Sequence, residues 1–455
     1  MKILFICPPS ETPFKQDDEY PLGLVYLASV LEKEGHEVLV KDYITRDWEK
    51  VKEEIINEVK ISNPEVVGLS CVTMNRSSCF KLAKMIKKFR PKIKIIMGGV
   101  HATSLYEQIL LNLPIDAIVM GEGEVTTPQL VNALETGNNL NNVKGISFKD
   151  GKKVIFTGHQ EPIHNLDSIP FPKHELFKDR IKKTGTALMI TSRGCPFGCT
   201  FCSTSRYWGR LWRPRSAKNV VDEIEYLKTN FPYVKRIFFH DDTLILDNKR
   251  IIDICNDILK RGIKIEWVCS GRVDRVSKEM LKKMKEAGCV RITYGVESGS
   301  PKILKSIEKN ITREQIKKAI QITNEVGLDY RTYLMVGNPG ESWDTIKETV
   351  EFLKELKNLS VESVGRLEIY PNTEIYQLAK KQGIIDDSYW LKDKKVPHYT
   401  YEHSENELTK MAYAIVASNQ MQKGWLNFVG FGVKFFFDKP KKAMKYILMK
   451  MGLIR

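Results

Sequence analysis

The chain has 455 residues, 42% of them hydrophobic and 28% charged, with a formal net charge of +15. This length suffices for about three domains of roughly 150 residues, and the composition is that of an ordinary soluble globular protein. No apolar run approaches the roughly 20 residues of a membrane-spanning helix, the amino terminus does not resemble a signal peptide, and nine cysteines in so long a chain do not suggest a disulfide scaffold. These features predict a cytoplasmic protein.

Residues 1–140 alternate between strand-like and helix-like segments. The helical segments carry apolar residues on one face, as at Leu24, Leu27, Ala28 and Leu31. Five such βα repeats with short connections predict a parallel sheet covered by helices on both sides, a doubly wound, flavodoxin-like α/β domain. Ligands of such domains bind at the carboxyl ends of the strands. The expected strands are residues 2–8, 37–43, 65–71, 94–99 and 116–122.

Residues 141–184 are expected to form a linker that begins with a hairpin over 141–156. A second βα series follows over 185–400, where six units are fewer than the eight of a complete barrel. We therefore expect a partial (β/α)6 TIM-type barrel, with Ser216 capping its first helix. From residue 401 to 455 the pattern becomes helical, then basic and aromatic. The expected barrel strands are residues 187–194, 236–242, 265–271, 291–298, 331–337 and 363–371.

Three cysteines lie together in the sequence Cys195-Pro-Phe-Gly-Cys199-Thr-Phe-Cys202, on the loop that leaves the first barrel strand. A cubane iron–sulfur cluster normally takes four thiolates, so three from one loop leave one iron open to a bound molecule. Gly194 and Gly198 allow the tight backbone that such convergence needs. The alternative is a structural zinc site with a distant fourth ligand, and the spacing favours the [4Fe–4S] cluster.

With this motif, including Phe201 before the last cysteine, residues 187–400 resemble the radical S-adenosylmethionine core. The resemblance implies that the open iron binds S-adenosylmethionine, whose reductive cleavage gives a 5′-deoxyadenosyl radical. It also implies reduced ferredoxin or flavodoxin as the electron donor.

The same resemblance implies contacts between the strand ends and S-adenosylmethionine. Asp241 and Asp242 would hold the methionyl amine, although a turn or a helix cap would also explain them. Arg272 would pair with the methionyl carboxylate or form an ordinary salt bridge. Glu297 would bind the ribose hydroxyls. Gly337 and Gly340 would bring the backbone to the adenine, unless they only form a turn.

Residues 1–140 resemble the cobalamin-binding domain that precedes the radical core in a large subfamily. The matching segments are PLGLVYLASVLEKEGHEV, SCVTMN, MGGVHAT and VMGEGE. The Asp-x-His-x-x-Gly motif, whose histidine binds cobalt in many cobalamin proteins, is absent. We therefore expect cobalt without a histidine ligand from that motif and interpret His101 as a hydrogen-bonding residue. The resemblance implies corrin and nucleotide-tail contacts from Ser70, Thr73, Gly98, Gly99, Gly121 and Gly123.

Cys7, Cys71 and Cys79 suggest a rival assignment, because methylthiotransferases hold a second cluster through three cysteines of their amino-terminal domain. The spacing here differs, and no small RNA-binding barrel follows the core. Buried, inert cysteines are the better interpretation.

The carboxyl-terminal segment combines aromatic residues with lysines, and residues 434–455 carry a net charge of +6. One interpretation is an amphipathic helix in the interface of an anionic membrane. The other is a helix packed on the barrel whose lysines reach solvent. Nucleic acid is not favoured, because the charge is not arranged around a recognisable reader.

These features predict a cobalamin-dependent radical enzyme that transfers a methyl group to an unactivated carbon of a small molecule, lipid or peptide. The alternative is a radical cyclase or rearrangement enzyme of the anaerobic porphyrin-ester cyclase type, which this layout also resembles. The intact cysteine triad argues against a third interpretation, a non-catalytic cobalamin sensor.

Overall fold

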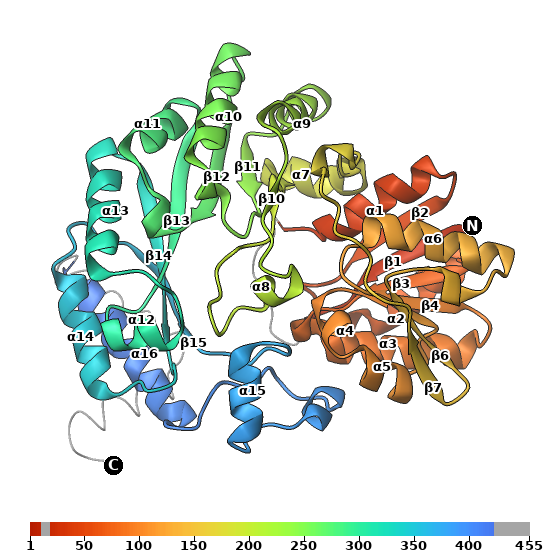
Figure 1. Ribbon diagram of the computed structural model, residues 1–455. Coiled ribbons are helices and arrows are strands. Elements are labelled where there is room, and N and C mark those ends of the chain that lie inside the picture. Colours follow the sequence, from red (N-terminus) through yellow and green to blue (C-terminus); the bar gives the residue numbers. More distant parts are fainter. Residues whose placement is uncertain (11–18, 423–455) are drawn as a thin grey trace. The chain divides into compact units, whose positions relative to one another are not determined.

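The computed structural model describes residues 1–10 and 19–422, which divide into two compact units (Figure 1). Of the described residues, the first unit comprises those within Met1–Ser270, Lys283–Val290 and Glu368–Pro397, and the second comprises Gly271–Lys282, Arg291–Leu367 and residues 398–422.

The first unit begins with a seven-stranded sheet of order β2-β1-β3-β4-β5-β6-β7. Its first five strands are parallel and lie where the sequence predicts them. Strands covered on both faces are apolar almost throughout, and β1, β3 and β4 follow this pattern with buried Val, Ile, Leu and Phe. The strands are β1 (Lys2–Cys7), β2 (Glu37–Asp42), β3 (Val66–Ser70), β4 (Lys94–Gly98) and β5 (Ala117–Val119).

Helices cover both faces of this sheet (Figure 1). Helices α1 and α6 contact each other, as do α2 and α3. Of the apolar stripe predicted on α1, Leu24, Ala28 and Leu31 are buried. Asp47 caps α2 by accepting a hydrogen bond from the Lys50 amide. The helices are α1 (Leu22–Lys33), α2 (Trp48–Ser62), α3 (Arg76–Phe89), α4 (Val100–Ser104), α5 (Tyr106–Asn112) and α6 (Gly123–Thr136).

The predicted hairpin is present as β6 (Ile146–Asp150) and β7 (Lys153–Phe156), an antiparallel pair. It also pairs with β5 and so extends the parallel sheet rather than standing apart from it. Helix α7 (Lys178–Thr184) then leads into the second βα series.

The first three strands of that series are parallel and belong to the first unit: β8 (Thr186–Met189), β11 (Arg236–Phe239) and β12 (Glu266–Gly271). Helices α9 (Ala217–Asn230) and α10 (Asn248–Lys260) pack on each other, and Ser216 caps α9 as predicted, by accepting from the Asn219 amide. A short antiparallel pair, β9 (Ser192–Arg193) and β10 (Arg213–Pro214), was not predicted. It lies on either side of the cysteine loop and α8 (Ser203–Tyr207). Helix α15 (Glu374–Lys381) also belongs to this unit.

The second unit contains the other three strands, except for Cys289 and Val290 at the start of the first of them. These strands are again parallel and in chain order: β13 (Cys289–Glu297), β14 (Asp329–Val336) and β15 (Val361–Arg366). Helix α16 (Glu405–Gln422) packs on β14, β15 and α14, which accounts for the described part of the predicted helical region. The basic, aromatic residues 425–455 lie outside the described residues. The remaining helices are α11 (Lys278–Glu286), which straddles both units, α12 (Pro301–Ser306), α13 (Arg313–Val326) and α14 (Trp343–Lys354).

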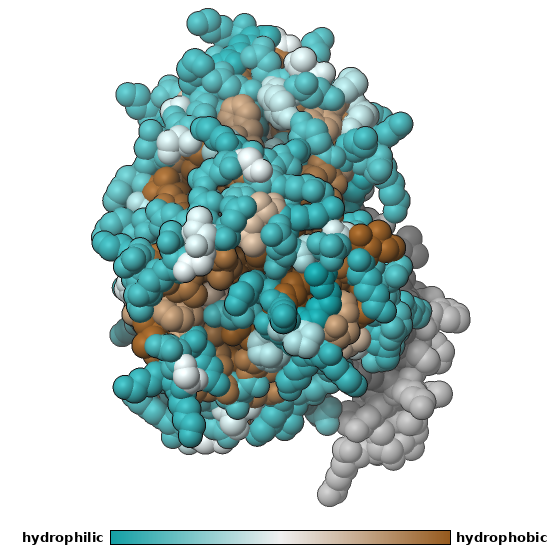
Figure 2. All heavy atoms as spheres, turned by 90° about the vertical axis from the view of Figure 1, so that its right-hand side faces the viewer, coloured by the Kyte–Doolittle hydropathy of each residue, from teal (hydrophilic) through white to brown (hydrophobic). Residues whose placement is uncertain are grey.

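The predicted fold class is thus confirmed: a flavodoxin-like doubly wound sheet is followed by six βα units and a helix. Among residues 1–10 and 19–422, no helix is both long enough and apolar enough to cross a bilayer. The face drawn in Figure 2 is largely hydrophilic, with scattered apolar patches.

Candidate functional site

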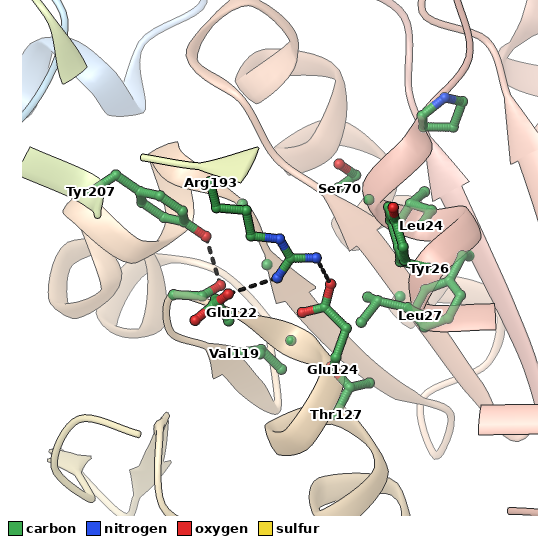
Figure 3. A pocket seen from close by; sticks show the side chains of 18 of the residues that line it. Leu24, Tyr26, Leu27, Ser70, Val119, Glu122, Glu124, Thr127, Arg193 and Tyr207 are labelled. Atoms are coloured by element: carbon green, nitrogen blue, oxygen red, sulfur yellow. Dashed lines mark hydrogen bonds and ion pairs between the residues drawn. The ribbon is translucent and has the colours of Figure 1, made fainter. Parts of the chain in front are cut away.

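A cavity of about 330 Å³ opens at the carboxyl ends of β1, β3, β4 and β5, entirely within the first unit (Figure 3). In the order β2-β1-β3-β4-β5, the chain builds the sheet outward in one direction up to β2 and in the opposite direction from β3. The switch point lies between β1 and β3, and ligands of doubly wound sheets bind there. One wall comes from these strand ends and α1, including Phe5, Leu24, Leu27, Met97 and Val119. The other comes from the second βα series: Ile190, Ser192, Arg193, Tyr207, Trp208, His240 and Asp242.

Five of the six residues predicted to contact cobalamin line this cavity: Ser70, Gly98, Gly99, Gly121 and Gly123. Gly99 has φ +101°, and a Cβ there would lie 2.6 Å from the Cys71 carbonyl oxygen, so only glycine fits. The cavity also contains a polar group that a ligand could satisfy. The Thr127 hydroxyl is 1% exposed and has no hydrogen-bond partner among the described residues. The lining therefore fits a ligand with polar groups on an apolar body, as cobalamin is.

Thr73, the sixth residue, does not line the cavity. Its hydroxyl is buried and lies 3.2 Å from His101 Nδ1. His101 is 1% exposed and packs between the rings of Phe80 and Trp390. Burial, with the neighbouring Arg76 guanidinium, lowers the pKa of His101 to about 3. The imidazole is therefore neutral and lies outside the cavity lining, as expected of a hydrogen-bonding rather than a cobalt-binding residue.

A charged cluster that sequence analysis missed lies on the cavity wall (Figure 3). Arg193 donates to Glu122 (2.6 Å) and to Glu124 (2.5 Å), and Arg213 donates to the second oxygen of Glu122 (2.6 Å). Burial disfavours the charged carboxylate, but the two guanidiniums outweigh it and hold the pKa of Glu122 below its usual range. In the sequence, the only sign of this cluster was a set of charged residues beside two predicted strands. They are the two glutamates of GEGE after one strand and the arginine of SRG just before the first cysteine.

The three clustered cysteines lie on the loop between β9 and α8. They are half-buried, whereas the other six cysteines are buried. Within residues 1–10 and 19–422, no three His, Cys, Asp or Glu side chains are gathered as a preformed metal site. The donor set nevertheless fits a cluster, because it offers three accessible thiols on one short loop. Phe201, between the last two of them, is also half-buried.

The backbone of this loop is closely fixed. Gly194 has φ +86°, and a Cβ there would lie 1.9 Å from the Leu211 carbonyl oxygen. The Gly194 amide donates to Asp242 (3.0 Å), and Cys195 Sγ lies 3.9 Å from Thr243 Oγ1. From the other side, the Ile375 amide donates to the Thr200 carbonyl (3.2 Å).

Asp241 and Asp242 follow β11 and have different surroundings. Asp241 is buried and accepts hydrogen bonds from the Thr191 amide (2.8 Å), the Thr191 hydroxyl (2.7 Å) and the Ser192 hydroxyl (2.5 Å). It thereby orients the segment that leads into the cysteine loop. Asp242 lines the cavity, where removal of its carboxyl from water, with a smaller contribution from the neighbouring Asp241 charge, raises its pKa to about 6.

Arg272 and Glu297 lie in the second unit. Arg272 is buried and donates to Asp274 (2.9 Å) and to the Lys309 carbonyl (2.8 Å). Glu297, at the end of β13, accepts from the Lys309 ammonium (2.8 Å) and has φ +66°. A non-glycine residue in that region is uncommon and often marks a functional position.

Gly337 and Gly340 follow β14, and both have positive φ, +86° and +81°. Their loop is folded around Glu341, which accepts from the amides of Gly337 (2.6 Å) and Asn338 (3.0 Å). Gly340 in turn donates to Glu402 (3.0 Å). Burial raises the pKa of Glu341 to about 7, although the two amides favour its charged form.

Cys7, Cys71 and Cys79 are buried, as predicted. The Cys79 thiol donates to the Ser70 carbonyl (3.5 Å), and burial raises the pKa of both Cys7 and Cys79. Protonated, buried thiols are poor metal ligands, so these residues support no second cluster.

Two segments of the chain each match a known protein family. A model of the radical SAM superfamily matches residues 189–353, and a model of the B12 binding domain matches residues 16–131. An uncharacterised methyltransferase of Pyrococcus horikoshii is 34% identical over 423 residues, covering 90% of this chain and 91% of that protein. An anaerobic magnesium-protoporphyrin IX monomethyl ester cyclase of Rubrivivax gelatinosus is 30% identical, covering 80% and 67%.

A similar fold is also found among solved structures. The cobalamin-dependent S-adenosylmethionine radical enzyme OxsB, with aqua-cobalamin and S-adenosylmethionine bound, matches with a TM-score of 0.74 at 22% identity. The match covers 99% of this chain and 71% of that one.

Proposed function

This chain belongs to the cobalamin-binding radical S-adenosylmethionine family, and from that premise we propose that it transfers a methyl group to an unactivated carbon. It is a radical S-adenosylmethionine enzyme whose cofactors are a [4Fe–4S] cluster, S-adenosylmethionine and cobalamin. Bound together, these groups supply a 5′-deoxyadenosyl radical and a transferable methyl group. The protein contributes binding, orientation and exclusion of water.

We assign Cys195, Cys199 and Cys202 as the ligands of the cluster, with Phe201 packed beside it. Asp241, Asp242, Arg272, Glu297, Gly337 and Gly340 remain proposed contacts to S-adenosylmethionine. Of these, Asp242 has the most direct support, because it both lines the cavity and holds the Gly194 amide. Ser70, Gly98, Gly99, Gly121 and Gly123 are the proposed cobalamin contacts, whereas Thr73 would act only through its neighbours.

One observation carries the proposal: a single cavity is lined both by the strand ends of the B12-type sheet and by residues on either side of the cysteine loop. Methyl transfer to a radical carbon requires the methyl carrier and the radical source to reach one substrate. A shared cavity meets that requirement, since proximity and orientation lower the barrier of such reactions.

The test is product analysis after anaerobic reconstitution, with candidate lipids, peptides and tetrapyrroles as substrates. Methyl transfer should yield S-adenosylhomocysteine together with 5′-deoxyadenosine and a product heavier by one methylene. Replacing all three cysteines by Ala should abolish 5′-deoxyadenosine formation. If that variant still produced it, the cluster assignment would be wrong.

A second candidate function is radical cyclisation or rearrangement, which the similarity to the Rubrivivax gelatinosus cyclase favours. It would yield 5′-deoxyadenosine without S-adenosylhomocysteine. The 34% identical relative is named a methyltransferase and matches over nearly its whole length, so methyl transfer is the better-supported proposal.

We further propose a cytoplasmic enzyme reduced by ferredoxin or flavodoxin, with peripheral membrane contact through residues 425–455. The domain boundaries at residues 140, 184 and 400 belong to the same proposal. With these boundaries, residues 1–140 form the cobalamin-binding domain and 141–184 the linker. Residues 185–400 form the radical core, and 401–455 form the helical, basic region.

A further inference from the structure

The loop after β5, Gly121–Glu124, is held from both sides of the cysteine loop. Arg193, two residues before Cys195, pairs with Glu122 and Glu124. Tyr207, five residues after Cys202, donates its hydroxyl hydrogen to the Gly121 carbonyl (2.6 Å). Figure 3 shows Arg193 and Tyr207 converging on this short stretch. The two ends of the segment that carries the cysteines are therefore anchored on one stretch of cavity wall.

The Arg193 anchor is built for rigidity. Its side chain is 8% exposed, and both carboxylates it pairs with are equally buried. Its guanidinium lies over the rings of Tyr26 (5.5 Å) and Trp208 (6.0 Å). Charge-assisted hydrogen bonds of this length, formed by buried groups, hold the guanidinium in place, and cation–π contacts with the two rings add to this.

The Gly121–Glu124 stretch is also part of the wall of the ligand cavity. Gly121, Glu122, Gly123 and Glu124 all line it, as do Arg193, Tyr207 and Trp208. A ligand in the cavity contacts the stretch that anchors the cysteine loop, and a cluster on that loop acts on the same stretch through Arg193. A ligand in the cavity and a cluster on the cysteine loop can therefore each shift the Gly121–Glu124 stretch, and through it the other site.

We propose that Arg193 is a positioning residue that couples cobalamin binding in the cavity to assembly of the cluster on the cysteine loop. The inference rests on the cofactor assignment of the proposed function. It predicts a reciprocal effect, because coupling between two binding sites changes both affinities by the same factor. The cluster should change the affinity for cobalamin, and cobalamin should change the stability of the cluster.

The experiment compares cobalamin dissociation constants, from absorbance titrations of the full chain, with and without the reconstituted cluster. In the wild type we expect the two constants to differ by about 5-fold or more. In Arg193→Lys the ratio of the two constants should approach one, even if both constants rise because Arg193 also lines the cavity. Lysine keeps the charge but cannot bridge two carboxylates with a planar fork.

The matched control is Arg215→Lys. Arg215 is also a buried arginine paired with a buried glutamate, Glu223, in the same unit, but it does not line the cavity. We expect this variant to keep the wild-type ratio. If Arg193→Lys does not fold, Glu124→Gln removes one of the two ion pairs and should lower the ratio in the same direction.

Any of three results would overturn the inference alone. The first two are a wild type that binds cobalamin equally with and without the cluster, and variants at Arg193 and Glu124 that keep the wild-type ratio. An equal loss of coupling in Arg215→Lys would also overturn it, because any buried arginine would then suffice. Failure of the wild type to bind cobalamin at all would instead overturn the proposed function, and this inference with it.

Discussion

Glu341 is a buried carboxyl whose charge state should make the stability of the protein depend on pH. Its pKa is about 7 in the folded chain, against an ordinary value of 4.5. The folded state therefore holds this proton more tightly than the unfolded state does. The group's contribution to stability is largest below pH 4.5, falls as the pH rises through 7, and is constant above that.

Replacing Glu341 by Gln should remove this loss, because the amide oxygen can still accept from Gly337 and Asn338 but carries no charge. We expect Glu341→Gln to be more stable than the wild type at pH 8 by up to roughly 3 kcal/mol, and the difference to shrink toward pH 5. Thermal melting of the apoprotein between pH 5 and 8.5 measures this. Glu402→Gln, on a carboxylate that accepts from Gly340 in the same loop, is the control and should not reproduce the effect. Equal slopes for wild type and Glu341→Gln would show that the carboxyl is ionised throughout.

His101 gives a second prediction at the level of single residues. His101 is buried and lies outside the cavity lining, and the Asp-x-His-x-x-Gly motif is absent, so we expect no imidazole ligand to cobalt from either source. The electron paramagnetic resonance spectrum of the cob(II)alamin form should lack nitrogen superhyperfine splitting, in the wild type as in His101→Gln. Splitting that disappears in His101→Gln would identify this histidine as the ligand and require the β4–α4 loop to rearrange.

The cysteine loop contains two glycines with different surroundings. At Gly194 a methyl group would meet the Leu211 backbone at 1.9 Å, and φ is positive. At Gly198 the nearest atoms are those at the end of the Arg210 side chain, at 2.8 Å, which can move aside. We therefore expect Gly194→Ala to lose most of the about four irons per chain after reconstitution, and Gly198→Ala to keep most of them. Iron and sulfide analysis measures the difference, and comparable losses in the two variants would show that backbone strain at Gly194 is not what shapes the loop.

The same element shows what sequence reasoning can find. Strands such as β3 and β4 were predictable because they are buried on both faces and therefore apolar throughout. The pair β9–β10 was not, since strands of two residues have no periodicity. The contacts of Arg193 with Glu122 and Glu124 were equally hidden, because those residues lie about 70 positions apart in the chain and only the fold brings them together.

At the scale of the whole molecule, the order of the domains could be predicted because each has its own series of βα repeats and its own sequence motif. The cysteine spacing pointed to the cluster, and the glycines after β4 and β5 pointed to the cavity that the structure contains. The anchoring of Arg272 by Asp274 and Lys309, and the fold of the β14 loop around Glu341, could not be read in advance. Both depend on burial and on side-chain directions, which patterns in a single sequence do not reveal.

The net charge of +15 is unevenly distributed, and its concentration near the carboxyl end supports the last prediction. Residues 425–455, outside the described part of the chain, combine seven aromatic residues with the net +6 of residues 434–455. The aromatic residues are Trp425, Phe428, Phe431, Phe435, Phe436, Phe437 and Tyr446. Aromatic rings favour the headgroup level of a bilayer, and each lysine near an anionic surface contributes about 1 kcal/mol, which salt screens.

We therefore expect the full chain to sediment with anionic vesicles at low salt, less so as salt rises, and not with neutral vesicles. A chain truncated after Gly424 should lose this binding while keeping its cluster and its cobalamin. Equal sedimentation of both forms would show that the segment is not a membrane anchor. An insoluble truncated form would show instead that the segment packs against the folded protein. Binding that depends on the segment would favour a lipid or other membrane-resident substrate, because a peripheral enzyme meets such molecules where it is held.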